Sequence, residues 1–205
     1  MKRPTNPPGE EPADEAYAHR LQALERRWLA RAFDVQRLYR RNIQRLGLGF
    51  VLDVGCGLGR NLRHAGGTGV GIDVDEVAVA TARARGLIAF TPTDFAVSEY
   101  AQPRRFDSLL MAHVLEHLPA DDGEALLRTY LPYVRASGRV VLICPQHAGF
   151  RADPTHMTFL EARHLERLAE RCAVSATSVR SHPFPRVVGR LFPHNETVLV
   201  GNKSG

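Results

Sequence analysis

The stretch Val51-Leu-Asp-Val-Gly-Cys-Gly-Leu-Gly-Arg60 decides the fold of this 205-residue chain. It predicts a short apolar strand, a loop with glycine at every second position, and a helix that begins beyond Gly59. Glycine lets the backbone turn sharply and approach a ligand with no Cβ in the way. Because the first turn of a helix also has free N–H groups, the stretch predicts a ligand-binding loop at the end of a strand.

The spacing of the glycines, together with Asp53, indicates which ligand this loop binds. A dinucleotide-binding loop has the pattern G-x-G-x-x-G, which would place its third glycine at position 60, but that residue is Arg60. The carboxylate of Asp53 would also repel the oxygens of a pyrophosphate. The same carboxylate would attract a cationic ligand with an amino-acid head, and S-adenosylmethionine is such a ligand.

Two later strand ends each carry a carboxylate. The stretch Gly69–Val74 contains Asp73, whose carboxylate can accept hydrogen bonds from both hydroxyls of a ribose. The stretch Leu87–Asp94 ends in Asp94, which can accept from an adenine amino group, and Phe95 can then pack on the adenine ring. Three acids at successive strand ends therefore favour a nucleoside ligand.

Strand and helix signals alternate along the rest of the main domain. Apolar runs at Phe106–Val114 and Gly138–Pro145 predict two further strands, and Asp75–Arg85 and Asp121–Arg135 predict helices. Continuous apolar strands that alternate with helices are typical of a parallel sheet covered on both faces.

The C-terminal part has a different pattern. The stretch Thr158–Cys172 predicts a helix that opens with the capping box Thr158-x-x-Glu161. The stretches Ala173–Val179 and Thr197–Gly201 predict two strands with no long helix between them. Two such strands form a hairpin, so we expect one edge strand to be antiparallel.

The N-terminal part predicts a disordered tail at residues 1–15 and a helical extension at 16–47, ahead of the main domain at 48–205. Residues 1–46 hold ten Lys and Arg against six Asp and Glu, and so account for +4 of the net charge of +5. Aromatic residues do not alternate with these charges as stacking platforms, so we expect no nucleic-acid partner. Because no apolar run resembles a membrane span or a signal peptide, we expect a cytoplasmic protein without integral membrane association.

These motifs resemble those of the class I S-adenosylmethionine-dependent methyltransferases, and the resemblance covers about residues 48–201. VLDVGCGLG is similar to their first motif, GIDVD to the acidic second, TPTDF to the adenine-side loop, FDSLLMAHVLEHL to the fourth strand and its exit, and VRASGRVVLICP to the fifth strand. The resemblance implies an α/β, Rossmann-like fold whose seven-stranded, mostly parallel sheet has the order 3-2-1-4-5-7-6, with the last strand antiparallel and helices on both faces. It also implies a set of cofactor-binding residues: Asp53, Gly55, Cys56, Gly57, Gly59, Asp73, Val74, Thr93, Asp94, Phe95, Ala112 and His113.

Ligands of open parallel sheets bind beyond the carboxyl ends of the strands, where the strand order reverses. The fourth strand leaves through His113-Val-Leu-Glu116-His117, and the fifth through Pro145-Gln-His147 and then Asp153-Pro-Thr-His156. Histidine titrates near neutral pH and a carboxylate can orient it, which suits removal of a proton from an acceptor hydroxyl. The expected catalytic residues are two candidates for the general base and two residues that shape the acceptor pocket: His147 and His117, and Asp153 and His156.

A metal ion offers a second way to activate the acceptor. The run His113-x-x-Glu116-His117 resembles the corresponding stretch of quinone-precursor O-methyltransferases and of some sugar O-methyltransferases, in which an acidic cluster can hold Mg²⁺. The resemblance implies Glu116 and His117 as metal ligands, where Mg²⁺ would lower the pKa of an acceptor hydroxyl. The sequence departs from that pattern, because it offers histidine where Mg²⁺ prefers oxygen ligands.

The leading hypothesis is an O-methyltransferase that acts on a hydroxyl of a small polar metabolite, namely a sugar or an oligosaccharide. The polar strand exits suit a hydroxylated acceptor, and the chain resembles small bacterial methyltransferases of polysaccharide tailoring, including those of methylmannose polysaccharide synthesis. The alternatives that stay open are an aromatic or quinone-precursor O-methyltransferase, an RNA methyltransferase, and a module that binds the cofactor without transferring its methyl group. A homodimer is the base-rate expectation for the oligomeric state.

Overall fold

The computed structural model describes residues 35–204. The expected tail at 1–15 lies outside the described residues, as does most of the expected helical extension at 16–47. The described part of that extension is the helix α2, Val35–Arg45, which ends shortly before Gly47. The sheet and all side chains discussed below belong to one compact unit, Tyr39–Gly205.

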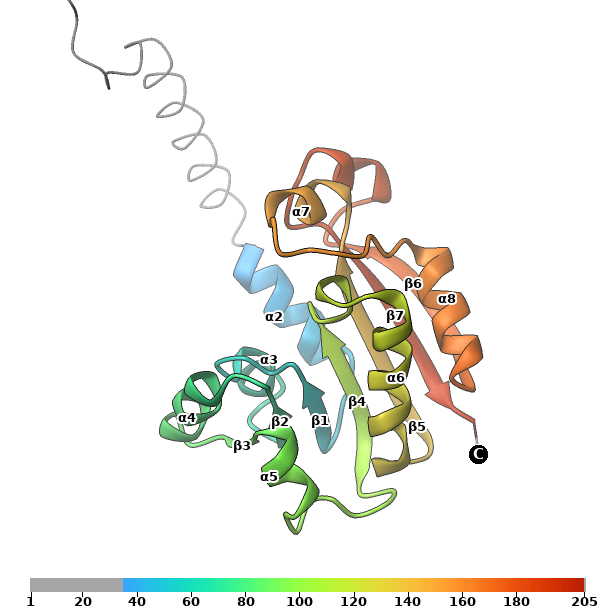
Figure 1. Ribbon diagram of the computed structural model, residues 1–205. Helices are drawn as coiled ribbons and strands as arrows, with labels where there is room; N and C mark the ends of the chain where they lie inside the picture. Colours follow the sequence, from blue (N-terminus) through green and yellow to red (C-terminus); the bar gives the residue numbers. More distant parts are fainter. Residues whose placement is uncertain (1–34, 205) are drawn as a thin grey trace, which may run out of the picture. The chain divides into compact units, whose positions relative to one another are not determined.

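Seven strands form one sheet with the order β3-β2-β1-β4-β5-β7-β6 (Figure 1). The strands are β1 Val51–Val54, β2 Gly69–Ile72, β3 Ile88–Phe90, β4 Phe106–Ala112, β5 Val134–Pro145, β6 Val174–His182 and β7 Glu196–Lys203. Neighbours among β1 to β5 pair in parallel, and β7 pairs antiparallel with both β5 and β6. The expected fold and strand order are confirmed. The antiparallel strand, however, lies one position in from the edge, because β6 rather than β7 forms the edge.

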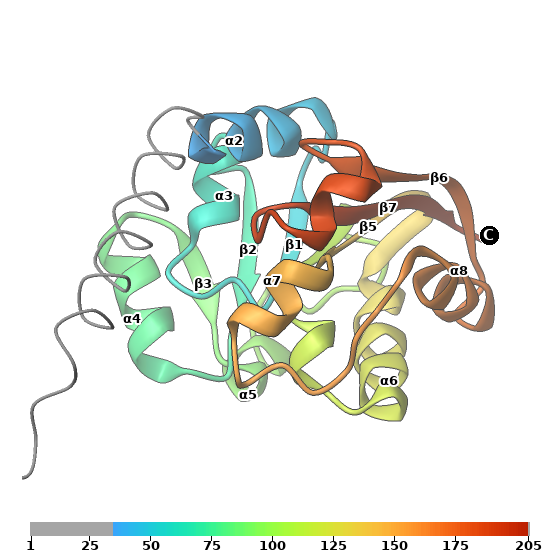
Figure 2. The ribbon, with the colours of Figure 1, turned by 90° about the horizontal axis from the view of Figure 1, so that it is seen from above.

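Helices cover both faces of the sheet (Figure 2). After α2 they are α3 Arg60–His64, α4 Glu76–Ala84, α5 Pro92–Ala96, α6 Ala120–Tyr130, α7 His147–Ala152 and α8 Ala162–Arg171, with short 3-10 helices η1 Leu115–His117, η2 Leu131–Tyr133 and η3 Arg186–Arg190. Ile43 of α2 and Leu62 of α3 belong to the core on one face, whereas Leu127 of α6 and Leu165 of α8 belong to the core on the other. Within residues 35–204, no helix is both long enough and apolar enough to cross a membrane.

The third strand is shorter than the expected stretch Leu87–Asp94. It stops at Phe90, and residues 92–96 form α5 instead. The Thr91 hydroxyl accepts a hydrogen bond from the Asp94 backbone N–H (3.1 Å) and thereby caps this helix. Pro92 explains the switch, because proline has no N–H for a strand ladder but fits the first turn of a helix.

The last helix starts later than the expected Thr158. The backbone N–H groups of Met157 and Thr158 donate to the Glu116 carbonyl (2.7 and 3.0 Å), so this segment runs along η1 instead of starting a helix. The helix α8 begins at Ala162, and Glu161 is its capping residue. The same hydrogen bonds bring the segment that follows α7 to the end of β4, where the candidate site lies.

Candidate active site

The glycine loop after β1 leaves room for a ligand at one position. Gly55, Gly57 and Gly59 all have positive φ angles (75°, 51° and 77°), a conformation that favours glycine. A Cβ at Gly55 or Gly59 would collide with Val114 or Leu87, whereas a Cβ at Gly57 would meet no atom within 4 Å. The loop is therefore closely packed at both ends and open at Gly57.

Asp53 lies in β1, just before this loop, with its side chain fully buried. Within the described residues, neither oxygen of its carboxylate has a hydrogen-bond partner. Burial raises the pKa of Asp53 to about 7, against the opposing influence of the Asn61 side chain and the Arg60 charge. A buried carboxylate without a partner is costly, and a bound cation would relieve that cost.

The helix α2 adds a contact that sequence reasoning missed. The Tyr39 hydroxyl donates to Oδ1 of the buried Asn61 (2.8 Å), and the Arg60 guanidinium lies 4.6 Å from the centre of the Tyr39 ring. Burial raises the pKa of Tyr39 well above its usual value, so the hydroxyl stays protonated and can donate. Tyr39 therefore orders two of the residues that influence the charge of Asp53.

Asp73, directly after β2, connects the second strand with the glycine loop. Its carboxylate accepts hydrogen bonds from the backbone N–H groups of Gly57 (2.7 Å) and Asp75 (3.0 Å). The neighbouring Val74 is an apolar side chain that is 84% exposed. The structure therefore places Asp73 and Val74 beside the one open position of the loop.

The third strand end contributes less than expected. Thr93 and Asp94 are exposed in the first turn of α5, and the Asp94 carboxylate lies 3.6 Å from the Arg83 guanidinium. Phe95 is only 1% exposed and packs edge to face against Tyr133, with the ring centres 5.0 Å apart. The expectation that Phe95 packs on an adenine ring is wrong, because the core already surrounds that ring.

Two other expected cofactor residues also have buried side chains. The Cys56 thiol lies against Gly71, where a Cβ would collide with the sulfur, and the Cys56 backbone N–H donates to the Ile72 carbonyl (3.0 Å). Ala112, the last residue of β4, is 5% exposed. The side chains of Cys56 and Ala112 therefore belong to the core beneath the site.

His113, the first residue after β4, bridges two buried glutamates. Its Nδ1 lies 3.2 Å from Glu116 Oε1, and its Nε2 lies 2.8 Å from Glu196 Oε1. Burial alone lowers the pKa of His113, but the hydrogen bonds and charges of the two glutamates outweigh burial and raise it to about 9. The ring is therefore a cation at neutral pH, and with both nitrogens protonated it cannot take a proton from an acceptor.

Glu196 is a site residue that sequence reasoning missed. It is the first residue of β7, and because β7 runs antiparallel to β5, Glu196 pairs with Pro145 at the end of β5. The start of an antiparallel strand thus reaches the edge where the parallel strands end. The expected strand Thr197–Gly201 begins one residue too late to include it.

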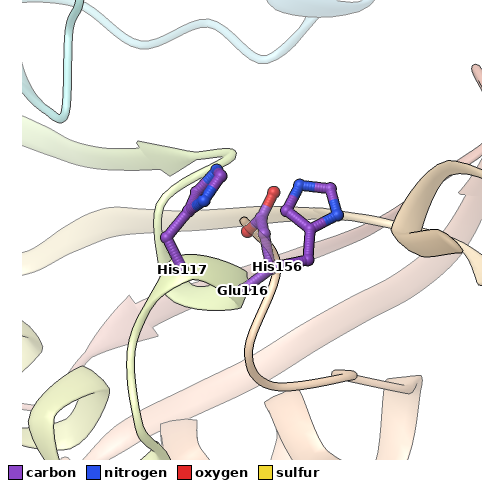
Figure 3. Close-up of side chains that lie close together, drawn as sticks. All are labelled: Glu116, His117 and His156. Atoms are coloured by element: carbon purple, nitrogen blue, oxygen red, sulfur yellow. The ribbon is translucent and has the colours of Figure 1, made fainter. Parts of the chain in front are cut away.

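Glu116, His117 and His156 lie together beside this bridge (Figure 3). Each offers one ligand atom, and these atoms lie within 4.8 Å of one another. Figure 3 shows the Glu116 carboxylate between the two imidazoles, whose ring centres are 4.7 Å apart. Glu116 is fully buried, and among the described residues its Oε2 has no hydrogen-bond partner. The cluster therefore contains a buried oxygen that is free to bind a proton donor or a metal ion.

Hydrogen bonds at Nδ1 orient both imidazoles of this cluster. Nδ1 of His156 lies 2.9 Å from the Phe150 carbonyl oxygen, which can only accept, so this nitrogen carries the proton. The Thr155 hydroxyl donates to Asp153 Oδ1 (2.6 Å) and therefore accepts from Nδ1 of His117 (3.1 Å). In each neutral ring, Nε2 is then the nitrogen with a free lone pair.

His147 lies apart from this cluster. It is the exposed first residue of α7, and it lines a cavity of about 610 Å³ between α7, η3 and the segment before α8. Of the four expected catalytic residues, the structure thus brings together His117, Asp153 and His156 and leaves His147 in the cavity.

Comparisons with known proteins agree with this geometry. A sequence profile for a methyltransferase domain matches residues 29–172. Among curated proteins no sequence matches this chain.

Solved methyltransferases share the fold of this chain. An S-adenosylmethionine-dependent methyltransferase from Archaeoglobus fulgidus is 18% identical, with 82% of this chain and 94% of that one covered and a TM-score of 0.62. Another from Thermotoga maritima is 17% identical, with 90% and 97% covered and a TM-score of 0.63. The magnesium protoporphyrin IX methyltransferase of Synechocystis, solved with bound S-adenosylhomocysteine, is 15% identical, with 81% and 84% covered and a TM-score of 0.58. At these identities the likeness is one of fold.

The profile match covers well over half of the chain, and the sheet order and the glycine loop agree with it. The chain therefore belongs to the methyltransferase-domain family and is a class I S-adenosylmethionine-dependent methyltransferase.

Proposed function

We propose that this enzyme transfers a methyl group from S-adenosylmethionine to a hydroxyl oxygen of a small polar acceptor, with His117 as the general base. The observation that carries the proposal is the relay from Asp153 through Thr155 to His117. The relay places the proton of the neutral ring on Nδ1, so Nε2 has a lone pair for a hydroxyl proton. His156 suits this role less well, because its side chain is only 7% exposed.

The residues around the glycine loop fit the proposed cofactor. The buried carboxylate of Asp53, which has no partner among the described residues, suits the ammonium group of the methionine part. The open position at Gly57 lets a ligand approach the backbone. Asp73 has lone pairs left for ribose hydroxyls, and the exposed Val74 suits the apolar face of adenine.

When bound, S-adenosylmethionine supplies a methyl carbon activated by its sulfonium. The chain has to hold an acceptor hydroxyl in line with that carbon and to remove the hydroxyl proton. His117 Nε2 accepts this proton while the new C–O bond forms, the C–S bond breaks and its electron pair stays on sulfur. Hydrogen bonds from Thr155 hold the pKa of Asp153 below its usual value, so a carboxylate stabilises the resulting imidazolium through the Thr155 hydroxyl.

We also propose a saccharide as the acceptor. The cavity beside His147, about 610 Å³ in volume, has the size of a small-molecule site. Its lining residue Phe159 and the cluster residue His156 both pack on the ring of Phe150, so the cavity adjoins the cluster that holds the proposed base. The polar side chains of Gln146 and Thr197 and the aromatic ring of Phe159 line it, which suits a molecule with several hydroxyls on a compact ring.

Transfer of a labelled methyl group into a fractionated bacterial extract tests this proposal. We expect the label in the water-soluble saccharide fraction, in a product that resists mild alkali, because ethers survive conditions that cleave methyl esters. The His117→Ala variant is the matched control and should transfer little label. Label in the lipid or RNA fraction, or label released by alkali, would overturn the proposed acceptor.

A metal-assisted route is a second proposal for the same site, and the cluster in Figure 3 favours it. Glu116 Oε2 and Nε2 of His117 and His156 would hold the ion, which would lower the pKa of the acceptor hydroxyl. Two imidazoles and one carboxylate suit Zn²⁺, Fe²⁺ or Mn²⁺ better than the originally expected Mg²⁺. With zinc–ligand bonds of about 2.1 Å, the three ligand atoms would have to move closer to one another by roughly 1 Å than they are now.

Chelation separates the two routes. If His117 acts as the base, exhaustive dialysis against a chelator leaves turnover unchanged. If a metal acts, turnover is lost and returns with Zn²⁺ or Mn²⁺ more readily than with Mg²⁺. The His156→Ala variant should lose metal affinity only in the second case.

A further inference from the structure

The cavity beside His147 carries an excess of positive charge. Arg151 of α7 and Arg186 and Arg190 of η3 line it, and Glu161 is the one carboxylate residue among the described residues that do so. Figure 1 shows α7 and the connection between β6 and β7 at the end of the sheet where β4 points, which is the end that carries the candidate active site. The excess charge therefore lies at the functional edge of the sheet.

Glu161 neutralises only one of these three arginines. Its Oε1 lies 2.8 Å from the Arg186 guanidinium, and its Oε2 lies 3.1 Å from the guanidinium of Arg163. Within residues 35–204, Arg151 and Arg190 have no carboxylate within ion-pair distance. They come from different elements yet line one cavity, so their position there does not follow simply from the high arginine content of the chain.

The floor of the cavity connects it with the rest of the site. Gln146 is buried, and its side-chain amide donates to the Ser181 hydroxyl (2.8 Å) and to the Glu196 carbonyl (3.1 Å). Glu196 in turn holds His113 at the end of β4. The cavity therefore adjoins the strand ends at which the methyl donor is expected to bind.

We propose that Arg151 and Arg190 bind an oxyanion of the acceptor, a phosphate or a carboxylate, in this cavity. That the bound molecule is the methyl acceptor rests on the proposed function, whereas the oxyanion site itself does not. The planar guanidinium of arginine presents paired N–H donors that match the oxygens of both groups. A concave, positively charged surface also concentrates anions near it. The apolar side chains of Leu160 and Val187 would contact the uncharged part of the acceptor.

Direct binding tests the oxyanion site without turnover. Calorimetry with the protein loaded with S-adenosylhomocysteine would compare glucose 6-phosphate, glucuronate and glucose as probes. We expect one charged sugar or both to bind measurably and glucose to bind at least about ten-fold more weakly, the effect of losing a charge-assisted hydrogen bond. The double variant Arg151→Gln/Arg190→Gln should lose this preference, and the exposed Arg41→Gln on α2 should keep it. Equal binding of glucose and the charged sugars, or an unchanged double variant, would overturn the proposal.

Transfer of the labelled methyl group then tests whether the oxyanion belongs to the acceptor. We expect the labelled product to bind to an anion-exchange resin, and a phosphatase will release it if the group is a phosphate but not if it is a carboxylate. In the double variant, KM for this acceptor should rise about ten-fold while kcat changes little. A labelled product that passes through the resin as a neutral molecule would overturn this assignment. Absence of any transfer, with charged sugars still bound through Arg151 and Arg190, would instead reject the proposed function and leave the oxyanion site in place.

Discussion

The cofactor side and the acceptor side of the site are built in different ways. Around β1 and β2, backbone turns and strand ends form the site, as in the hydrogen bond from the Gly57 N–H to Asp73. Beyond β4 and β5, side chains from three separate segments form it: His117 after β4, His156 after α7, and Glu196 at the start of β7. Loops vary more freely than the strands that carry them, so the acceptor side can change chemistry while the cofactor side stays the same. A change on one side should therefore leave the other intact.

The replacement His117→Ala should impair catalysis on the acceptor side and leave cofactor binding unchanged. We expect kcat to fall about 10²- to 10⁴-fold, the usual contribution of a general base, while the Kd for S-adenosylmethionine changes little. Single-turnover transfer and calorimetry with S-adenosylmethionine measure the two effects. The control is His147→Ala, which removes an imidazole from the cavity and should raise KM more than it lowers kcat. Normal turnover in His117→Ala would remove this residue from the catalytic role.

The replacement Phe95→Ala should reduce stability and leave both sides of the site chemically intact. Loss of a buried aromatic ring costs about 3–5 kcal/mol of unfolding free energy. Urea denaturation measures this loss, and titration with S-adenosylmethionine at low temperature measures the affinity of the folded fraction. The milder Phe95→Leu should cost less than about 1.5 kcal/mol and serves if the alanine variant does not fold. A large loss of cofactor affinity with little loss of stability would restore Phe95 to the adenine site.

The replacement Thr155→Val should weaken the acceptor side by a smaller amount. It removes the hydroxyl that links Asp153 to His117, so the proton of the His117 ring is no longer held on Nδ1. We expect kcat to fall about ten-fold, the lower end of the effect of removing a partner that orients an imidazole. Thr155→Ser keeps the hydroxyl and should retain most of the activity. An unchanged pH–rate profile in Thr155→Val would count against the relay.

The pH dependence of cofactor binding should depend on Asp53 and not on the acceptor side. The pKa of Asp53 is about 7 in the protein without ligand, so the carboxylate that we propose as the partner of the cofactor ammonium is largely protonated below that pH. Below pH 7, binding of S-adenosylmethionine requires Asp53 to release a proton first, which weakens the measured affinity. Affinity should therefore rise about ten-fold between pH 6 and pH 8, where this proton is already lost. Calorimetry across this range would show the rise, and the Asp53→Asn variant should bind more weakly with a flat profile.

The same pKa makes a prediction about the stability of the protein without ligand. Because the folded-state pKa of Asp53 lies above its unfolded value, the folded state binds more protons, and stability falls as pH rises from about 4 through 7. Asp53→Asn should remove this fall and raise the Tm above pH 7. A variant with lower Tm at pH 8 would show that the carboxylate already has a stabilising partner.

Local sequence patterns indicated parts of both sides of the site, and tertiary packing explains what they missed. The glycine loop, Asp53 and Asp73 are determined by a few adjacent residues, so their patterns can be recognised locally. Phe95 was misassigned because its burial depends on Tyr133, which packs on it from a distant part of the chain. Glu196 was missed because only the antiparallel pairing of β7 with β5 brings it to the active edge.

The sequence by itself determined the Rossmann-like fold, the strand order implied by the family resemblance, and the loop that suits a cationic nucleoside. Apolar periodicity, glycine spacing and acids at strand ends are properties of neighbouring residues, and they constrain the backbone directly. Only the tertiary structure decided that His117 is in the relay while His147 is in the cavity, and that Arg151 and Arg190 line the same cavity. Those outcomes depend on how the loops and short helices that follow the strands pack over the strand ends. Hydrogen bonds between segments far apart in the chain, such as those from Met157 and Thr158 to the Glu116 carbonyl, determine that packing.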